Sequence, residues 1–298
     1  MNYVLTLIAD PARPVLDPSI AAKVAEALGS AGFHTGEPDF LAPGIACDIP
    51  IQGQGPKGAE AMARQAVGST SLDIAVQLQH GRKKKLLACD MDATLIENEI
   101  VDEIAAVAGL RDQIAPITAR SVAGDIDFLT SLKERVALLK GLPMARYLEA
   151  KNAIRFVPGG KSLIATMRAN GAHTMIISGG FRAFTSSVRD ALGMDEDAAN
   201  DVEITGGALT GKLVSPVVGR EQKAEILRRA ALRLGLDISE TMAVGDGAND
   251  AGMIAASGLG VAFRAKPTLK SVAAAVIDHG DLTALLYLQG YRREEIQS

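Results

Sequence analysis

The chain has 298 residues, 48% of them hydrophobic and 22% charged, which is typical of a globular protein with a sizeable core. A net charge of −4 gives no strong field for nucleic acid or an anionic membrane, and no apolar run reaches the roughly 18 residues of a membrane span. We therefore expect neither a nucleic-acid partner nor a membrane partner.

The N-terminus and the cysteines indicate a reducing compartment. The opening run, MNYVLTLIAD, contains no basic residue, and Asp10 interrupts its apolar stretch early, unlike in a signal peptide. Cys89 falls in a stretch that we predict to be a buried strand, so a disulfide with Cys47 is not expected. Both points predict a cytoplasmic protein. The four histidines are scattered, which argues against a zinc cluster or a histidine-driven triad.

Residues 1–80 form the first expected domain. Apolar, β-branched runs predict strands, and alanine-rich runs predict helices. In chain order they are a strand over 3–10, a helix over 18–32, a further strand near 38–43, a strand over 46–53, a helix over 56–68 and a strand over 72–78. This order is the ferredoxin-like α+β pattern. We interpret the basic run that follows, residues 80–85, as a solvated linker, because no aromatic residues are interleaved as in a nucleic-acid patch.

Residues 81–298 form the second expected domain, in which short apolar runs alternate with helices. The runs lie at 85–92, 173–180, 241–247 and 259–263, with a weaker fifth at 274–278, and the helices include 159–171, 220–235 and 249–258. This alternation predicts an α/β, Rossmann-like parallel sheet with helices on both faces. We also expect a helical cap over about 99–155, directly after the first strand, and a hairpin over 201–215 around Gly206–Gly207.

Polar side chains follow three of these predicted strands, at the point where each strand ends. They are, in chain order, Asp90, Asp92, Ser178, Asp246, Asn249 and Asp250, with the backbone of Gly179 beside Ser178 and with Lys223 in the first turn of the helix over 220–235. Each feature alone is a weak signal. Ligands of open parallel sheets bind at the carboxyl ends of the strands, so together these groups predict a binding site.

The chemistry of these groups suits phosphoryl transfer. Asp90 and Asp92 are two residues apart, so they point the same way from a strand and repel each other unless a cation lies among them. Hard oxygen ligands favour Mg²⁺, whereas Lys223, Ser178 and nearby backbone N–H groups can bind a phosphate. One acid can attack phosphorus, and the other can protonate the leaving oxygen and then activate water.

The motifs DMDAT, SGG, Lys223 and GDGANDAGM resemble the four motifs of the haloacid dehalogenase-like phosphatases, over residues 86 to about 290. Within that superfamily, the stretches DMDATLIENE, FVPGG and SLKERVALLKGLP are similar to the phosphoserine phosphatase family. The resemblance implies Mg²⁺-dependent hydrolysis of O-phosphoserine through an aspartyl-phosphate, the last step of serine biosynthesis. Residues 1–80 resemble an ACT-like regulatory or association module by pattern alone, which leaves a serine effector and a homodimer as open expectations.

Motif by motif, the resemblance implies Asp90 as the nucleophile and Asp92 as the acid and base. It also implies that Mg²⁺ is held by Asp90, the main-chain carbonyl of Asp92, and Asp246. Ala93 departs from the family, where Ser is frequent at this position. The other implied positions are Ser178, Gly179, Lys223 and Asn249 around the phosphate, with Thr94 and Asp250 in support behind them.

We expect the cap to choose the substrate, because phosphoserine carries an ammonium and a carboxylate beyond its phosphate. Glu99 is the candidate for the ammonium, and Arg135 is the candidate for the carboxylate, which its fork matches. Arg135 falls inside the apolar arc of the helix over 128–141, and an internal salt bridge of the cap is the alternative. Phe128 packs either over the substrate or in the core. Glu97 has no expected role beyond a solvated charge.

Several other functions remain open. The main alternative is a phosphatase or phosphotransferase for another small phosphate ester, since the motifs indicate the reaction rather than the ester. A signalling receiver domain would lack the cap insertion and the acid at Asp92, and a P-type pump would need membrane spans. A serine-sensing binding protein with a decayed catalytic half is the last alternative, and the complete acid set argues against it.

Overall fold

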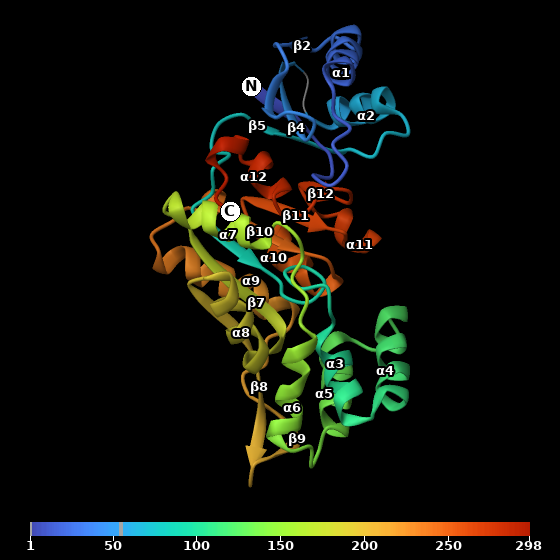
Figure 1. The fold of residues 1–298 in the computed structure, drawn as a ribbon, viewed down its shortest axis with the longest axis vertical. Coiled ribbons are helices and arrows are strands. Elements are labelled where there is room, and N and C mark those ends of the chain that lie inside the picture. The colour runs from blue at the N-terminus through green and yellow to red at the C-terminus, as the bar shows by residue number, and fades with distance from the viewer. Residues whose placement is uncertain (1, 54–55) are drawn as a thin grey trace.

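Two β-sheets organise residues 2–53 and 56–298, which the computed structural model describes. In Figure 1 the sheet of residues 2–78, here called the N-terminal unit, lies above the larger core sheet, and the cap helices lie below the core. None of the helices in these ranges is both long and apolar enough to cross a membrane.

The N-terminal unit is an antiparallel sheet with two helices. Its elements are β1 (Asn2–Ile8), α1 (Pro18–Ser30), β2 (His34–Thr35), β3 (Asp39–Ala42), β4 (Ala46–Gln52), α2 (Pro56–Val67) and β5 (Asp73–Leu78). The strand order is β2-β4-β1-β5, and β3 also pairs with β4. This is the predicted ferredoxin-like order with its second strand split in two. The split falls at 36–38, where Pro38 cannot donate a ladder hydrogen bond.

The core sheet is parallel except at one edge. Its strands are β6 (Leu86–Cys89), β7 (His173–Phe181), β8 (Glu196–Thr205), β9 (Ala208–Val214), β10 (Thr241–Gly245), β11 (Leu259–Phe263) and β12 (Ala275–Ile277). Their order is β12-β11-β10-β6-β7-β8-β9, and only β9 runs antiparallel to its neighbour. The predicted parallel core is confirmed. The predicted hairpin is longer than expected, because the acidic, alanine-rich start of β8 pairs with β7.

Both faces of the core sheet are covered, which explains its continuous apolar runs. Leu87 and Cys89 pack on one face, with α7 (Gly160–Ala169), α8 (Arg182–Leu192) and α12 (Ala284–Leu288). Leu86 and Ala88 pack on the other, with α9 (Arg220–Arg233), α10 (Ala251–Ala256) and α11 (Pro267–Lys270). Cys89 is buried in β6 as predicted; Cys47 is also buried, and both cysteines are free.

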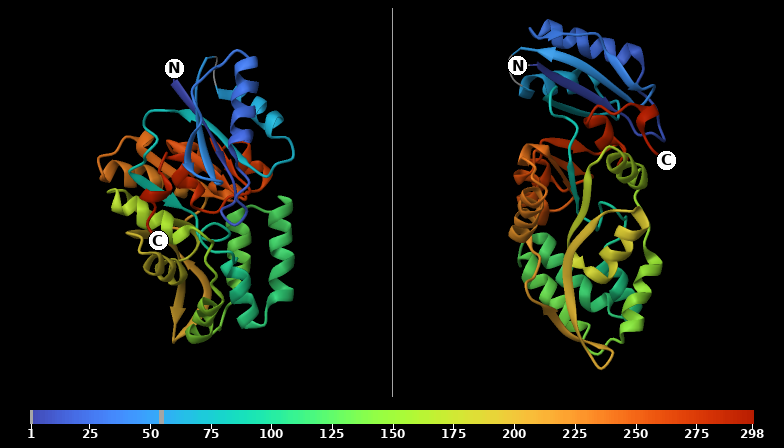
Figure 2. Two further views of the ribbon diagram at one scale, coloured as in Figure 1. Left: turned by 45° about the horizontal axis from the view of Figure 1, so that its top comes forward. Right: turned by 90° about the vertical axis from the view of Figure 1, so that its left-hand side faces the viewer.

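The cap consists of α3 (Ile100–Ala108), α4 (Arg111–Ala123), α5 (Phe128–Leu138) and α6 (Met144–Glu149), followed by a 3-10 turn over Ala150–Ala153. Figure 2 shows the cap and the β8–β9 hairpin at the end of the molecule opposite the N-terminal unit. Two segments, residues 95–98 and 155–157, connect the cap to the core, and we call them the cap linkers. They pair with each other: the Glu97 N–H donates to the Arg155 carbonyl at 2.8 Å, and the Val157 N–H donates to the Leu95 carbonyl at 3.0 Å.

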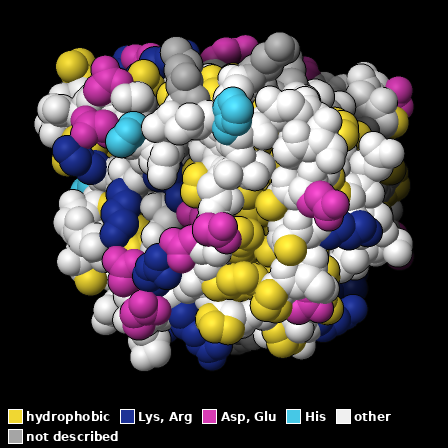
Figure 3. Space-filling model, turned by 90° about the horizontal axis from the view of Figure 1, so that it is seen from above, with side chains coloured by type: hydrophobic (Ala, Val, Ile, Leu, Met, Phe, Trp, Pro, Cys, Tyr) yellow, Lys and Arg dark blue, Asp and Glu magenta, His cyan; other side chains and the backbone are white. Residues whose placement is uncertain are grey.

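The basic run at 80–85 is not a solvated linker throughout, and for Arg82 that interpretation is wrong. The Arg82 guanidinium is almost buried, with Nη1 2.5 Å from Asp48 Oδ2. It also donates to the carbonyls of Tyr287 and Leu288, each at 3.0 Å. Arg82 therefore joins the N-terminal unit to the core. Figure 3, a view onto the N-terminal unit from above, shows acidic and basic side chains interspersed on that face.

Candidate active site

A cavity of about 530 Å³ separates the carboxyl ends of β6, β7 and β10 from the helices α3, α4 and α5. Groups predicted from both parts of the sequence line it. From the core these are Asp90, Asp92, Ser178, Gly179, Asp246 and Asn249, and from the cap they are Glu99, Phe128 and Arg135. The structure therefore places the strand-end acids and the cap charges around one space.

A buried lysine holds two of the acids together. Lys223, in α9, has no exposed side-chain surface, and its Nζ lies 2.9 Å from Asp90 Oδ1 and 2.6 Å from Asp250 Oδ1. Although burial opposes it, the charges of Asp250 and Asp90 raise the pKa of Lys223. The Met91 backbone N–H also donates to Asp90 Oδ1, at 2.7 Å. Both contacts of Asp90 thus use the same oxygen.

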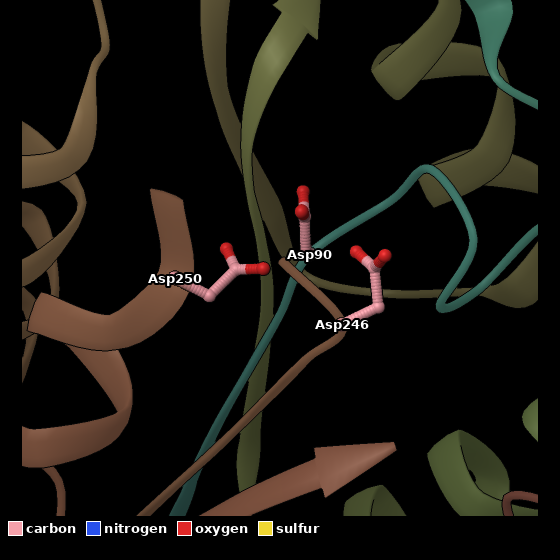
Figure 4. A group of neighbouring side chains, drawn as sticks. All are labelled: Asp90, Asp246 and Asp250. Atoms are coloured by element: carbon pink, nitrogen blue, oxygen red, sulfur yellow. The ribbon is translucent and has the colours of Figure 1, made fainter. Parts of the chain in front are cut away.

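Asp90, Asp246 and Asp250 form a cluster in which one carboxylate oxygen from each residue lies within 4.8 Å of the other two (Figure 4). Burial, together with the charge of Asp90, raises the pKa of Asp246 to about 6 and that of Asp250 to about 7. Such carboxylates repel one another unless a proton or a cation lies among them. Both carboxylate oxygens of Asp250 already accept hydrogen bonds, Oδ1 from Lys223 and Oδ2 from the Gly247 N–H, whereas Asp90 uses Oδ1 alone. Asp90 and Asp246 are therefore the carboxylates that fit a hard divalent cation.

Asp92 reaches from the core to the first residue of the cap. Its Oδ1 accepts a hydrogen bond from the Ile100 backbone N–H at 2.9 Å. Burial, with the charges of Glu99 and Asp90, raises the pKa of Asp92 well above its usual value. A carboxyl with a raised pKa can hold a proton for transfer to a leaving group. Although β6 ends at Cys89, both Asp90 and Asp92 line the cavity as predicted.

The Ser178–Gly180 stretch lies inside β7, which continues to Phe181, where the pairing with β8 becomes irregular. Ser178 Oγ accepts the Gly180 N–H at 2.9 Å, which leaves the hydroxyl proton free for a ligand. A Cβ on Gly179 would lie 2.5 Å from Cζ of Phe128, so any side chain there would have to displace the Phe128 ring. The Phe128 ring of the cap thus packs directly against the core strand at the cavity.

Glu99 and Arg135 line the cavity from the cap, each within reach of opposite charges but outside ion-pair distance of any described residue. Burial, with the charges of Asp246 and Asp90, raises the pKa of Glu99 to about 7. Burial lowers the pKa of Arg135, and its Nε donates to the Ser131 carbonyl at 3.3 Å. Neither side chain forms an ion pair with any described residue. The alternative of an internal salt bridge of the cap therefore finds no partner for Arg135 within 2–53 and 56–298.

Thr94 and Ala93 shape the loop that follows the two acids. Ala93 has a φ of 51°, a left-handed conformation that costs most residues roughly 1–2 kcal/mol. Thr94 is fully buried, and its Oγ1 lacks a hydrogen-bond partner among the described residues. The turn therefore forms at an alanine, without the side-chain hydroxyl of the serine that is frequent at this position in the family.

Sequence reasoning missed Lys266. This residue follows β11, lines the cavity, and donates its backbone N–H to the Asp246 carbonyl at 3.0 Å. Its charge also favours the ionised forms of Asp246 and Glu99. Lys266 lies just beyond the carboxyl end of the fourth predicted strand, where ligands of parallel sheets bind, so its position in the sequence is the signal that indicates it.

Comparisons with known proteins show the family to which the chain belongs. Residues 87–255 match the family model of the haloacid dehalogenase-like hydrolases. The chain is 40% identical over 240 residues to the phosphoserine phosphatase of Streptomyces coelicolor, covering 80% of this chain and 58% of that protein. It is 40% identical over 203 residues to the phosphoserine phosphatase of Lactococcus lactis, covering 68% of this chain and 94% of that protein.

A solved structure extends the similarity to the N-terminal unit. The crystal structure of a haloacid dehalogenase family hydrolase from Salmonella enterica serovar Typhi has a TM-score of 0.83 at 27% identity, covering 96% of this chain and 98% of that one. The chain spans little more than half the length of the Streptomyces relative. The family model covers most of the core sheet and all of the cap, so this chain belongs to the haloacid dehalogenase-like hydrolases.

Proposed function

We propose that this chain hydrolyses O-phospho-L-serine to L-serine and phosphate in a Mg²⁺-dependent reaction, the last step of serine biosynthesis. One observation carries the proposal. A single cavity contains the acids suited to phosphoryl transfer at the sheet edge and, on the cap, Glu99 and Arg135, which form no ion pair with a described residue. Phosphoserine presents the complementary ammonium and carboxylate beside its phosphate. The Streptomyces and Lactococcus relatives, each 40% identical, support this choice of ester.

Asp90 is the nucleophile in this proposal. Its contacts with Lys223 and with the Met91 N–H both use Oδ1, which leaves Oδ2 to attack phosphorus and form an aspartyl-phosphate. The Lys223 ammonium, buried against Asp90, can offset negative charge on the phosphate oxygens. The Ser178 hydroxyl and the backbone N–H of Gly179 add hydrogen-bond donors, and Asn249 lies beside them in the lining.

Asp92 moves the proton. It donates to the serine oxygen as the P–O bond breaks, and it then takes a proton from the water that attacks the aspartyl-phosphate. Its raised pKa suits the first step, and its bond to the Ile100 N–H keeps the carboxyl at the cavity. Mg²⁺ held by Asp90, the Asp92 main-chain carbonyl and Asp246 would supply positive charge that offsets the charge of the phosphate.

The cap supplies recognition. Glu99 pairs with the substrate ammonium, and Arg135 forms a fork with its carboxylate. Phe128, which packs against Gly179, closes over the bound amino acid. Binding of serine or of a second copy by residues 1–80, and a cytoplasmic location, stay predictions.

The test is phosphate release from a panel of esters by the full chain. With Mg²⁺ we expect phosphoserine to be hydrolysed with the highest kcat/KM, ahead of phosphothreonine, glycerol phosphate and an aryl phosphate, and chelation to stop all four. A higher kcat/KM on an ester without an amino-acid end would favour the alternative of another small phosphate ester. Full activity after exhaustive chelation would contradict the metal site.

A further inference from the structure

Asp73 begins β5 in the N-terminal unit, but its side chain bonds the core. The residue is only 3% exposed. Its Oδ1 accepts the backbone N–H of Asp278 at 2.8 Å and that of His279 at 3.1 Å, and its Oδ2 accepts that of Gly280 at 2.8 Å. One buried carboxylate thus fixes the turn over 278–280, which follows β12.

That turn is bonded to a second turn beside the cavity. Nη2 of Arg264 donates to the Gly280 carbonyl at 3.1 Å, and the Arg264 backbone N–H donates to the Ile277 carbonyl at 2.7 Å. Two residues later, the Lys266 N–H donates to the Asp246 carbonyl, and the Lys266 side chain lines the cavity. A continuous set of hydrogen bonds and short chain segments therefore runs from Asp73 to Asp246.

The second turn is strained. Arg264 has a φ of 45°, in the left-handed region that residues other than glycine seldom adopt. Such a conformation persists only where the surrounding structure holds it in place. Besides the ladder-like bond to Ile277, the hydrogen bond from the Arg264 side chain to Gly280 holds this turn. Figure 1 shows β11, β12 and α11 directly below the N-terminal unit, where this contact lies.

We propose that Asp73 and Arg264 are positioning residues for the active site, through which the N-terminal unit holds the 264–266 turn against Asp246. Loss of either contact lets the strained turn relax, and Lys266 and Asp246 then move relative to Asp90. The N-terminal unit carries none of the proposed catalytic side chains, yet it would help to position Lys266 and Asp246 at the cavity. The inference rests on the proposed function for its substrate, whereas its effect on metal binding is measured separately.

The experiment compares three single variants of the full chain and the double variant Asp73→Asn/Arg264→Ala. Asp73→Asn removes one anionic oxygen from the 278–280 turn, and Arg264→Ala removes the bond to Gly280. The matched control is Asp48→Asn, a buried acid of the same unit whose partner, Arg82, bonds the carbonyls of α12 instead. Mg²⁺ binding is read from the rise in Tm with Mg²⁺ concentration, and KM and kcat for phosphoserine are measured in parallel.

We expect Asp73→Asn and Arg264→Ala each to raise the Mg²⁺ concentration at half-saturation, and KM, by roughly 2- to 30-fold. The double variant should lose no more than the worse single variant, because both act through one contact set. Asp48→Asn should lower Tm without Mg²⁺ but leave the Mg²⁺ half-saturation and KM unchanged.

Wild-type Mg²⁺ half-saturation in a folded Asp73→Asn protein would overturn the inference, as would additive losses in the double variant. An equal change in Asp48→Asn would also overturn it, because general loosening of the unit would then be the cause. If Asp73→Asn does not fold, the exposed Arg264 decides the question, and unchanged values for Arg264→Ala overturn the inference. A wild-type chain that binds Mg²⁺ but does not hydrolyse phosphoserine would refute the proposed function. The Mg²⁺ half-saturation values of the variants would still test the positioning role of Asp73 and Arg264.

Discussion

The two sides of the cavity differ in how their charges are balanced. On the sheet side, Lys223 is buried between Asp90 and Asp250 and neutralises part of their charge. On the cap side, Glu99 and Arg135 form no ion pair with any residue in 2–53 or 56–298. A buried charge without a partner is costly, so the cap charges gain most from a ligand that brings the opposite charges. In the proposed function the sheet side performs the chemistry and the cap side recognises the substrate, so variants on the two sides should have different effects.

The largest effect is expected on the sheet side, from Asp90→Asn. Loss of the proposed nucleophile should lower turnover on the order of 10⁴-fold or more, for phosphoserine and aryl phosphate alike. Acid-quenched protein should also lose the phosphate adduct that intact-mass measurement detects in the wild type. Robust hydrolysis by the Asp90→Asn protein would contradict the mechanism.

Asp92→Asn should lower turnover of phosphoserine by about 10²- to 10⁴-fold, the usual contribution of a general acid and base. The asparagine oxygen can still accept the Ile100 N–H, so the cap should stay attached. An aryl phosphate with an acidic phenol needs no proton on its leaving group, so formation of its phosphoenzyme should slow much less. Burst kinetics with both esters measure this, and equal slowing of the two bursts would remove Asp92 from the acid role.

Arg135→Ala tests the cap side. Leaving the substrate carboxylate unpaired costs roughly 2–5 kcal/mol, or about 30- to 3,000-fold in kcat/KM for phosphoserine. An aryl phosphate has no carboxylate, so its hydrolysis should change little. Glu134→Ala, on the same helix and paired with Arg120 near the surface, is the control. Equal losses on both esters would assign Arg135 to the scaffold of the cap.

The pH dependence of Mg²⁺ binding sharpens the comparison further. Without metal, burial and Asp90 raise the pKa of Asp246 to about 6, and Mg²⁺ needs the ionised carboxylate. Binding must therefore release a proton at or below that pH, and the affinity should fall by roughly tenfold per pH unit below it. Calorimetry in two buffers of different ionisation enthalpy should show proton release near pH 6 and almost none at about pH 8. The same affinity and no released protons at both pH values would be incompatible with this site.

The smallest effect is expected for Glu97→Ala, two residues from the proposed ammonium site. Glu97 pairs with Arg155 at 3.3 Å, and both side chains are about half exposed, so the pair contributes little. We expect a change of less than about twofold in kcat/KM for phosphoserine, against a large loss for Glu99→Ala. Similar losses in the two variants would mean that the cap linker, rather than Glu99, is responsible.

The sheet side could be predicted from the sequence because its signals are local. Asp90 and Asp246 each follow a short apolar run, and parallel pairing then brings the strand ends to one edge. The turn that contains Lys266 obeys the same rule and was missed only because its strand carries no acid. The start of β8 was missed for a different reason, since its acidic residues and alanines have neither strand periodicity nor β-branched content.

Contacts between distant parts of the chain could not be predicted. Asp73 and Gly280 are 207 residues apart, and no pattern around either one points to the other. Arg82 lies in a basic run that looks solvent-exposed in the sequence. Its burial against Asp48 depends on how the two sheets pack together, which the sequence does not indicate. The left-handed backbone at Ala93 is likewise set by the packing of its loop, since alanine does not favour that conformation.

The paired cap linkers bear on how new specificities could evolve. Because residues 95–98 and 155–157 lie side by side, the chain leaves the core and returns to it at neighbouring points. An insertion between neighbouring points leaves the strand order unchanged, and its closure entropy grows only slowly with its length. The cap can therefore change in length or be replaced by another insertion while Asp90, Lys223 and Asp246 keep their positions in the core. If the proposed function holds, changes in the cap could alter which phosphate ester is bound while the proposed catalytic groups stay unchanged.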